Sequence, residues 1–372
     1  MNIPSVNRGH ETNLDFVRAF AVLVVVGAHL GWFLGDLRLG FFEISLLGRL
    51  GVVIFFVHSG IVNLLSIERH VQEHGQHRLL RAFMTKRCLR IYPLSLVVVA
   101  AVYLSHISVA HIDKWSTTAA NHPNAEVIPS LLLVQNFFQF DQLLEPLWSL
   151  PYEIQIYMLF PAIYLLLRRL GSTRALVFAW AALATVEFVI APHIVKHANV
   201  GQVFALPDML YFFLWFLAGI YAYKEMQHSR RILPFWMLPA LVGVLCVICS
   251  LSYDRNKFLF ISFCFGLALP HFHSCEDRAV NGFCSWVAKY SYGIYLLHDP
   301  AIWLGFVRSS HIPMFARISI FLSATFGGSV LLYHAIEHPM VVIGNRAGAA
   351  ISRGKRVRVA LRPATVAAGA GQ

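Results

Sequence analysis

Three ionisable side chains lie in the first long apolar segment of the chain, residues 14–34. In a helix, Asp15, Arg18 and His29 would share a stripe about 60° wide, with His29 roughly 16 Å beyond Arg18 along the axis. Asp15 and Arg18 can pair because they are three residues apart, and an imidazole can act as a general base. Each of these residues could instead have a purely structural role. Asp15 and Arg18 could form an ion pair at a helix end, and His29 could bond to a backbone carbonyl. The shared face favours a functional role for the three residues.

A basic cluster occupies residues 81–93. Lys86, Arg87 and Arg90 precede Pro93, where we expect a loop to enter a helix at its cytoplasmic end. Two guanidiniums three residues apart can converge on one phosphate group, because arginine presents planar, paired donors. Basic loops also orient membrane proteins without binding any ligand. The cluster therefore predicts either a phosphate site or an orientation signal alone.

A third group of polar residues follows Trp148. Ser149, Glu153 and Tyr157 recur every four residues, so they share one face of a predicted helix. A glutamate that enters an apolar helix is usually paired or faces an aqueous cavity. Glu153 could therefore orient a catalytic histidine or act as an acid–base group.

A fourth group lies in the apolar run near residue 298. His298 and Asp299 directly precede Pro300. Proline frees a backbone carbonyl inside a helix, and such breaks in membrane proteins often line a cavity. The pattern makes His298 a candidate for contact with a substrate.

One motif resembles a zinc site but lacks a ligand. His334, Glu337 and His338 match the HxxEH pattern of some zinc proteases. Such a site needs a third, acidic ligand further along the chain, and neither Asp nor Glu occurs after Glu337. We therefore predict no metal.

Composition indicates what positions these residues. Hydrophobic residues make up 57% of the 372-residue chain, charged residues make up 13%, and the mean hydropathy is +0.61. A spanning helix needs roughly 20 apolar residues. The sequence predicts an all-α integral membrane protein of about ten transmembrane helices, with a cytoplasmic N-terminus at 1–13, a membrane domain at 14–340 and a basic, disordered tail at 341–372. The predicted spans are 14–34, 45–67, 91–110, 146–167, 176–192, 207–224, 233–252, 258–271, 288–307 and 315–336.

The charge distribution predicts the orientation. When the predicted spans alternate from a cytoplasmic start, about two thirds of the 30 Lys and Arg residues fall on the cytoplasmic side. Both termini are then expected in the cytoplasm. The net charge of +11 needs no nucleic-acid partner to explain it.

Taken in order, these motifs resemble the membrane acyltransferase-3 family. The similarity covers residues 14 to 340. It is carried by 14–29, by the Gly-Val-…-Phe-Phe-…-Ser-Gly stretch at 51–60, by Arg-x-x-Arg at 87–90, by Trp-Ser-Leu-…-Glu at 148–153, by 291–298 and by Glu-His-Pro at 337–339. His58 and Asp299 depart from the pattern. We expect this protein to be a standalone acyltransferase without the extracytoplasmic hydrolase-like domain that some members carry.

The resemblance implies transfer of an acyl group, expected to be acetyl, from acyl-CoA to a hydroxyl of a glycan or related acceptor in the bacterial cytoplasmic (inner) membrane. The expected partners are membrane lipid, the coenzyme A thioester and a carbohydrate or other hydroxyl acceptor. The assigned residues are His29, Glu153, Asp15 and Arg18 for catalysis, Arg87, Arg90 and Lys86 for coenzyme A, and Trp148, Ser149, Tyr157 and His298 for the acceptor.

A transporter or flippase of a lipid-linked glycan or small anion is the alternative. It would also place charges on one face of an early helix. Transporters of this kind commonly carry an internal repeat, and the two halves of the sequence show no convincing similarity.

Overall fold

The computed structural model describes residues 9–35, 38–39, 42–105, 123–138, 143–170, 172–189, 205–252 and 254–353, and nearly all regular structure in them is helical. The two short strands, β1 (Arg38–Leu39) and β2 (Phe42–Glu43), form an antiparallel hairpin. The α-helices are α1 (Gly9–Phe33), α2 (Leu47–His74), α3 (Leu79–Leu104), α4 (Pro123–Leu132), α5 (Gln135–Phe138), α6 (Leu150–Tyr157), α7 (Phe160–Leu167), α8 (Arg174–Val189), α10 (Ala205–Glu225), α11 (Met237–Leu251), α12 (Arg255–Ala268), α13 (Arg278–Ile302), α14 (Met314–Leu322), α15 (Gly328–Leu332) and α16 (His338–Arg353). The 3₁₀ turns are η1 (Ile44–Leu46), η3 (Glu145–Trp148) and η4 (Leu269–His271), and the π-helical turns are η5 (Trp303–Arg308), η6 (Ser323–Gly327) and η7 (Tyr333–Glu337).

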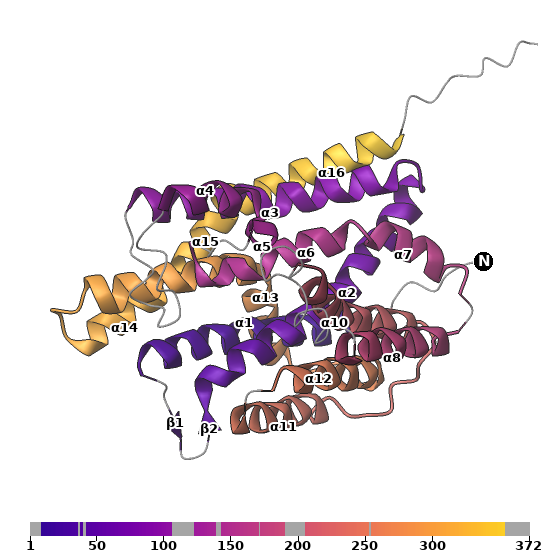
Figure 1. Ribbon diagram of the computed structural model, residues 1–372, viewed down its shortest axis with the longest axis horizontal. Coiled ribbons are helices and arrows are strands. Elements are labelled where there is room, and N and C mark those ends of the chain that lie inside the picture. Colours follow the sequence, from indigo (N-terminus) through magenta and orange to yellow (C-terminus); the bar gives the residue numbers. More distant parts are fainter. Residues whose placement is uncertain are drawn as a thin grey trace, which may run out of the picture.

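Helix α2 is the central element of the bundle. It packs against α1 on one side and α10 on another, α13 packs on α1, and α16 lies along α3 (Figure 1). Within α2, 83% of the apolar stretch is buried, as expected for a helix that is apolar on every face. Gly60 lets α2 approach α10 closely, because a Cβ there would lie 2.6 Å from the carbonyl oxygen of Phe216.

Four helical runs among the described residues are long and apolar enough to cross a bilayer. These runs are Thr12–Phe33, Ile44–His74, Leu79–Leu104 and Met314–Arg353. A pair of helices bent by 47°, Glu145–Tyr157 with Phe160–Leu167, would make a fifth span. The protein is therefore an integral membrane protein by length and composition, although fewer helices meet these criteria than the ten predicted. Several predicted spans form short helices: α12 has 14 residues and reaches roughly 21 Å, less than the bilayer core of about 30 Å.

Two helices extend further than the sequence pattern predicted. Helix α3 begins at Leu79 and continues through Pro93, so Arg87 and Arg90 lie inside a helix and not in a loop at its mouth. The last apolar run continues beyond residue 336 through η7 and α16 to Arg353. Residues 341–353 of the predicted disordered tail are therefore helical, and 354–372 lie outside the described residues.

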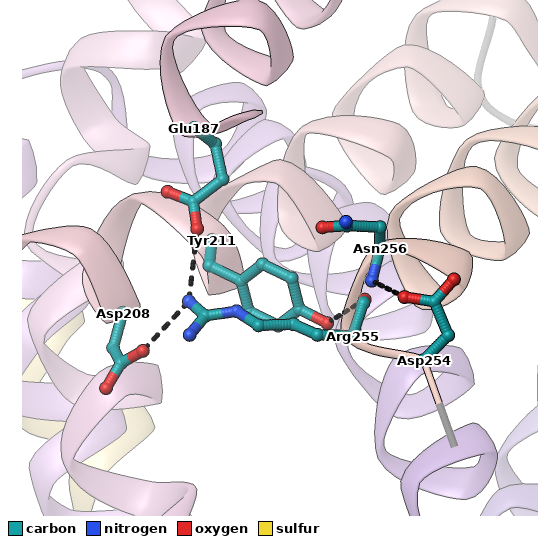
Figure 2. A network of polar contacts seen from close by, with 6 residues as sticks. All are labelled: Glu187, Asp208, Tyr211, Asp254, Arg255 and Asn256. Carbon is teal, nitrogen blue, oxygen red and sulfur yellow. Dashed lines mark hydrogen bonds and ion pairs between the residues drawn. The ribbon is translucent and has the colours of Figure 1, made fainter. Parts of the chain in front are cut away.

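Arg255, the first residue of α12, ties three helices together. Its Nη2 donates to Oε1 of Glu187 on α8 and to Oδ1 of Asp208 on α10, at 3.0 Å each, and its guanidinium lies 4.3 Å from the centre of the Tyr211 ring (Figure 2). The Tyr211 hydroxyl donates to the backbone carbonyl of Arg255 at 2.6 Å. These contacts join the ends of α8, α10 and α12.

Candidate active site

Two histidines from α1 and α13 form a pair in the interior of the bundle. His29 Nδ1 lies 2.6 Å from His298 Nε2, and the two rings are stacked with centroids 4.9 Å apart. His298 is fully buried and His29 is half-buried. The sequence predicts a functional role for each histidine separately, and the packing of α13 on α1 brings them together.

Hydrogen bonding assigns a proton arrangement to the pair. His298 Nδ1 lies 3.3 Å from the backbone carbonyl of Ile294, which can only accept, so we place a proton on that nitrogen. In a neutral ring His298 Nε2 is then an acceptor, and His29 Nδ1 must donate to it. Nε2 of a neutral His29 consequently carries a lone pair, which is the form that a general base requires.

Tyr295 connects His298 to the segment around Ser149. Its ring centroid lies 6.0 Å from that of His298, and its hydroxyl lies 2.8 Å from Ser149 Oγ. The structure thereby links two of the residues that the sequence assigns to the acceptor. Sequence reasoning missed Tyr295, although its position three residues before His298 places both on one helix face.

Oδ2 of Asp299 accepts from the backbone amide of Glu145 at 3.3 Å and so joins η3 to α13.

Trp148 and Glu153 have other neighbours. The guanidinium of Arg49 lies 5.6 Å from the centre of the Trp148 ring, and the Trp148 and Phe212 ring centres are 5.4 Å apart. Glu153 Oε1 accepts hydrogen bonds from the hydroxyls of Tyr157 and Ser59. Glu153 is 5% exposed. Its hydrogen bonds thus run to α6 and α2 and not to the histidine pair.

A cavity of about 470 Å³ opens among α1, α2, α3, α13, η7 and α16. Positive charges dominate its lining, and Arg18 is held there by a 2.6 Å hydrogen bond from its Nε to Ser291 Oγ. We call it the cationic cavity. Its charged lining residues are Asp15, Arg18, Arg69, Arg90, Lys289 and Glu337. The predicted residues Asp15, Arg18 and Arg90 thus meet in one place, and Arg69 and Lys289 are additions that the sequence did not indicate. Glu337, which the sequence singled out in the HxxEH and Glu-His-Pro motifs, also lines the cavity.

The other two basic residues assigned to coenzyme A lie elsewhere. The Arg87 guanidinium is buried against the rings of Phe83 and Tyr157, at 5.2 and 5.5 Å from their centres. Lys86 Nζ lies 2.9 Å from His70 Nδ1. Neither residue lines the cationic cavity. The structure therefore separates three side chains that the sequence placed together.

Two buried polar atoms of the cavity wall have no hydrogen-bond partner among the described residues. They are Nδ1 of His58, which is 3% exposed, and Oε2 of Glu337, which is 2% exposed. Buried polar groups are normally satisfied, so an unpaired atom in a cavity wall points to a ligand. The cavity thus offers cations for anionic groups and two further atoms for hydrogen bonds.

The histidines of the HxxEH motif are separated by their contacts. His334 is exposed with Nε2 3.3 Å from the Tyr290 hydroxyl, and His338 packs on the ring of Tyr333. In the part of the chain that the structure describes, no group of three His, Cys, Asp or Glu side chains could hold a metal ion.

A family model described as an acyltransferase domain (Acyl_transf_3) matches residues 11–334, which is most of the chain. The chain belongs to the acyltransferase-3 family. The description of the matching model names acyl transfer as the chemistry of the domain. The region matched by the acyltransferase-3 model includes the histidine pair and most of the residues that line the cationic cavity.

Relatives among curated proteins are distant. The chain is 26% identical over 375 residues to the "Putative peptidoglycan O-acetyltransferase YrhL" of Bacillus subtilis (strain 168), covering 90% of this chain and 55% of that protein. It is 28% identical over 216 residues to the "Acyltransferase MdmB" of Streptomyces mycarofaciens, covering 55% and 51%. It is 26% identical over 315 residues to "Nodulation protein 10" of Rhizobium leguminosarum bv. viciae, covering 78% and 82%. The chain thus spans about half the length of the first two relatives. No solved structure matches it.

Proposed function

We propose that this protein transfers an acyl group, acetyl in the first instance, from acyl-CoA to a hydroxyl group of a glycan or related acceptor. The observation that carries the proposal is that the histidine pair and the cationic cavity share α1 and α13. Family membership supports acyl transfer, and the name of one relative refers to O-acetylation of peptidoglycan. A glycan is therefore the acceptor class we favour.

The donor binds in the cationic cavity. Arg18, Arg69, Arg90 and Lys289 supply positive charge for the phosphate groups of coenzyme A. Of the basic cluster near residue 87, only Arg90 takes part directly. Arg87 lies outside the cavity, against Phe83 and Tyr157, and so does not contact the donor in this arrangement.

His29 is the general base of the transfer. Its Nε2 takes the proton of the acceptor hydroxyl while the hydroxyl oxygen attacks the thioester carbonyl. The carbon–sulfur bond then breaks, and the coenzyme A thiolate recovers the proton from the His29 imidazolium. His298 holds the His29 tautomer through the Nδ1–Nε2 hydrogen bond. Positioned general bases contribute about 10²–10⁴-fold to rates.

The acceptor approaches from the side of η3 and α6. Ser149 and Tyr295 lie beside His298 there, and Trp148 offers a ring next to them. Aromatic rings and hydroxyls are suitable contacts for a sugar, which has apolar faces and a polar edge. Glu153 serves as a structural anchor beneath this segment, bonded to Tyr157.

The orientation that supports this mechanism places both chain ends in the cytoplasm of a bacterial cell. The cationic cavity then opens toward cytoplasmic acyl-CoA, and η3 faces the outside of the inner membrane. The shorter apolar helices, such as α11 and α12, complete the membrane domain toward about ten transmembrane segments.

The proposal is tested by mass spectrometry of surface glycans from a bacterial host with and without the protein. Glycans from cells with the wild type are expected to gain acyl esters, and glycans from cells with His29→Ala are expected to lack them at equal expression. His334→Ala is the matched control, because His334 is exposed on η7. Transport of labelled lipid-linked glycan into vesicles without any acyl transfer would instead establish a transporter.

A further inference from the structure

None of the hydrogen bonds described above involves His58, although its side chain forms part of the wall of the cationic cavity. His58 is 3% exposed, and its Nδ1 atom has no hydrogen-bond partner among the described residues. It is also one of two residues that depart from the pattern of the acyltransferase-3 family. A buried imidazole that the fold leaves unsatisfied is costly, unless a ligand in the adjoining cavity completes its hydrogen bonds.

The stripe of α2 that lines the cavity has His58 at one end and Arg69 at the other. Its members follow one another at intervals of three or four residues, as one helix face requires; they are His58, Val62, Leu65 and Arg69. The two ends are roughly 16 Å apart along the helix axis. Arg69 lies near the end of α2, whereas His58 lies near its middle. His58 therefore marks the inner end of the cavity.

Apolar packing lies beyond His58. The rings of His58 and Phe55 have centroids 6.3 Å apart, and the guanidinium of Arg18 lies 5.8 Å from the centre of the Phe55 ring. Phe55 and Val52 line a second, small cavity between α1, α2 and α13, whose free volume is only about 10 Å³. Residues 50–57 of α2 carry no hydrogen-bonding side chain. A ligand that extends inward past His58 thus meets no further polar side chain in that stretch of α2.

The hydrogen bonds that His58 can make differ from those of the cations around it. Side chains such as Arg90 and Lys289 only donate, and their charge suits phosphate groups. A neutral imidazole has one N–H donor and one acceptor nitrogen, and an amide group has the matching acceptor and donor. Coenzyme A carries both kinds of group, because an arm with amide groups separates its phosphates from its thiol.

From this arrangement, and resting on the acyl-CoA activity proposed above, we infer that His58 binds the amide-bearing pantetheine arm of the donor. The arm lies between the phosphate-binding cations and the apolar packing around Phe55. His58 takes no part in bond breaking. It gives the cationic cavity a preference for a ligand with phosphates and an amide-bearing arm over a ligand with phosphates alone, and so is a specificity-determining residue.

Binding of coenzyme A and of 3′-phospho-ADP to the purified full-length protein in nanodiscs tests this inference. The nucleotide carries the phosphates of coenzyme A without the arm. His58→Leu should weaken the binding of coenzyme A by about 2- to 13-fold, the equivalent of one hydrogen bond, and leave the binding of 3′-phospho-ADP unchanged. His58→Asn keeps a hydrogen-bonding group close to the place of Nδ1 and should recover part of the loss. His77→Leu is the matched control, because His77 is exposed.

The melting temperature of His58→Leu without ligand distinguishes a binding role from a structural one. Leucine removes a buried polar group that has an unpaired atom, so the variant should melt at or above the temperature of the wild type. A much lower melting temperature would show instead that His58 stabilises the fold.

The binding outcomes separate this inference from the proposed function. If the wild type binds neither coenzyme A nor 3′-phospho-ADP, the donor proposed above is wrong, and so is the role of His58. If the wild type binds coenzyme A and His58→Leu keeps the same affinity, only the role of His58 is overturned. That role is also overturned if His58→Leu weakens both ligands equally, because His58 would then act on the phosphates or on the fold.

Discussion

His29 Nδ1 and His298 Nε2 lie 2.6 Å apart, and the second ring nitrogen of His298 lies 3.3 Å from the Ile294 carbonyl. Because the Ile294 carbonyl can only accept, it determines which ring nitrogen of each histidine carries a proton. It leaves His29 with its basic nitrogen on the far side of the ring from His298. The orientation of one imidazole thus depends on a backbone atom of another helix.

We predict that His298 acts by positioning His29. His298→Ala should lower kcat and leave the KM for acetyl-CoA unchanged, while His29→Ala should lower kcat by about 10²–10⁴-fold. In His298→Gln the amide oxygen can accept from His29 Nδ1 and should recover part of the lost kcat. Steady-state kinetics of the four proteins decide the point. Equal kcat values for His298→Ala and wild type would contradict the prediction.

Arg90 is predicted to contribute to donor binding. Arg90→Ala should raise the KM for acetyl-CoA by about 10- to 150-fold, the equivalent of one hydrogen bond to a charged group, with little change in kcat. Arg81→Ala serves as the control, because Arg81 is exposed on the same helix. Comparable KM values for the two variants would show that Arg90 does not contact the donor.

Glu153 is predicted to stabilise the fold. Glu153→Ala removes the buried acceptor of the Tyr157 and Ser59 hydroxyls and should cost about 1–3 kcal/mol in the free energy of unfolding. Glu153→Gln retains an acceptor and should cost less. Thermal melts in detergent measure both variants against Glu276→Ala, an exposed control. A melting temperature for Glu153→Ala equal to that of the control would show that the contact is not stabilising.

The contacts of Arg255 with Glu187, Asp208 and Tyr211 are predicted to stabilise the fold without affecting catalysis. Arg255→Ala leaves the buried carboxylate of Glu187 without its partner and should cost about 1–3 kcal/mol, with kcat near that of the wild type. Arg255→Met combined with Glu187→Gln should recover part of the stability, because the uncompensated charge is gone. Hydrogen exchange should locate the loosening in α8 and α12. Exchange that rises first in α1 would contradict this placement.

The first helix shows what the sequence can predict. Helical periodicity alone places Asp15, Arg18 and His29 on one face, and all three lie where the structure has the cavity or the histidine pair. The pairing with His298 depends on the packing of α13, 269 residues further along the chain, which no local pattern encodes. The resemblance to the family indicated both histidines but not their contact.

The basic cluster shows why other expectations changed. With α3 starting at Leu79, Arg87 and Arg90 are rotated by about 60° around one helix axis. That rotation sends Arg87 onto Tyr157 and Arg90 into the cavity. Hydropathy likewise locates apolar stretches but not where a helix bends, as it does between α6 and α7 by 47°. The span count therefore fell below the predicted ten among the described residues.

The small apolar cavity between α1, α2 and α13, whose walls include Val25, Val52 and Tyr295, matters for the electrical integrity of the cell. An enzyme that receives its donor on one side of a membrane and its acceptor on the other must not become an ion channel. Apolar constrictions block ions by losing their water, and this one has room for about one water molecule. If the protein transfers acyl groups as proposed above, these packed walls also preserve the proton gradient across the membrane.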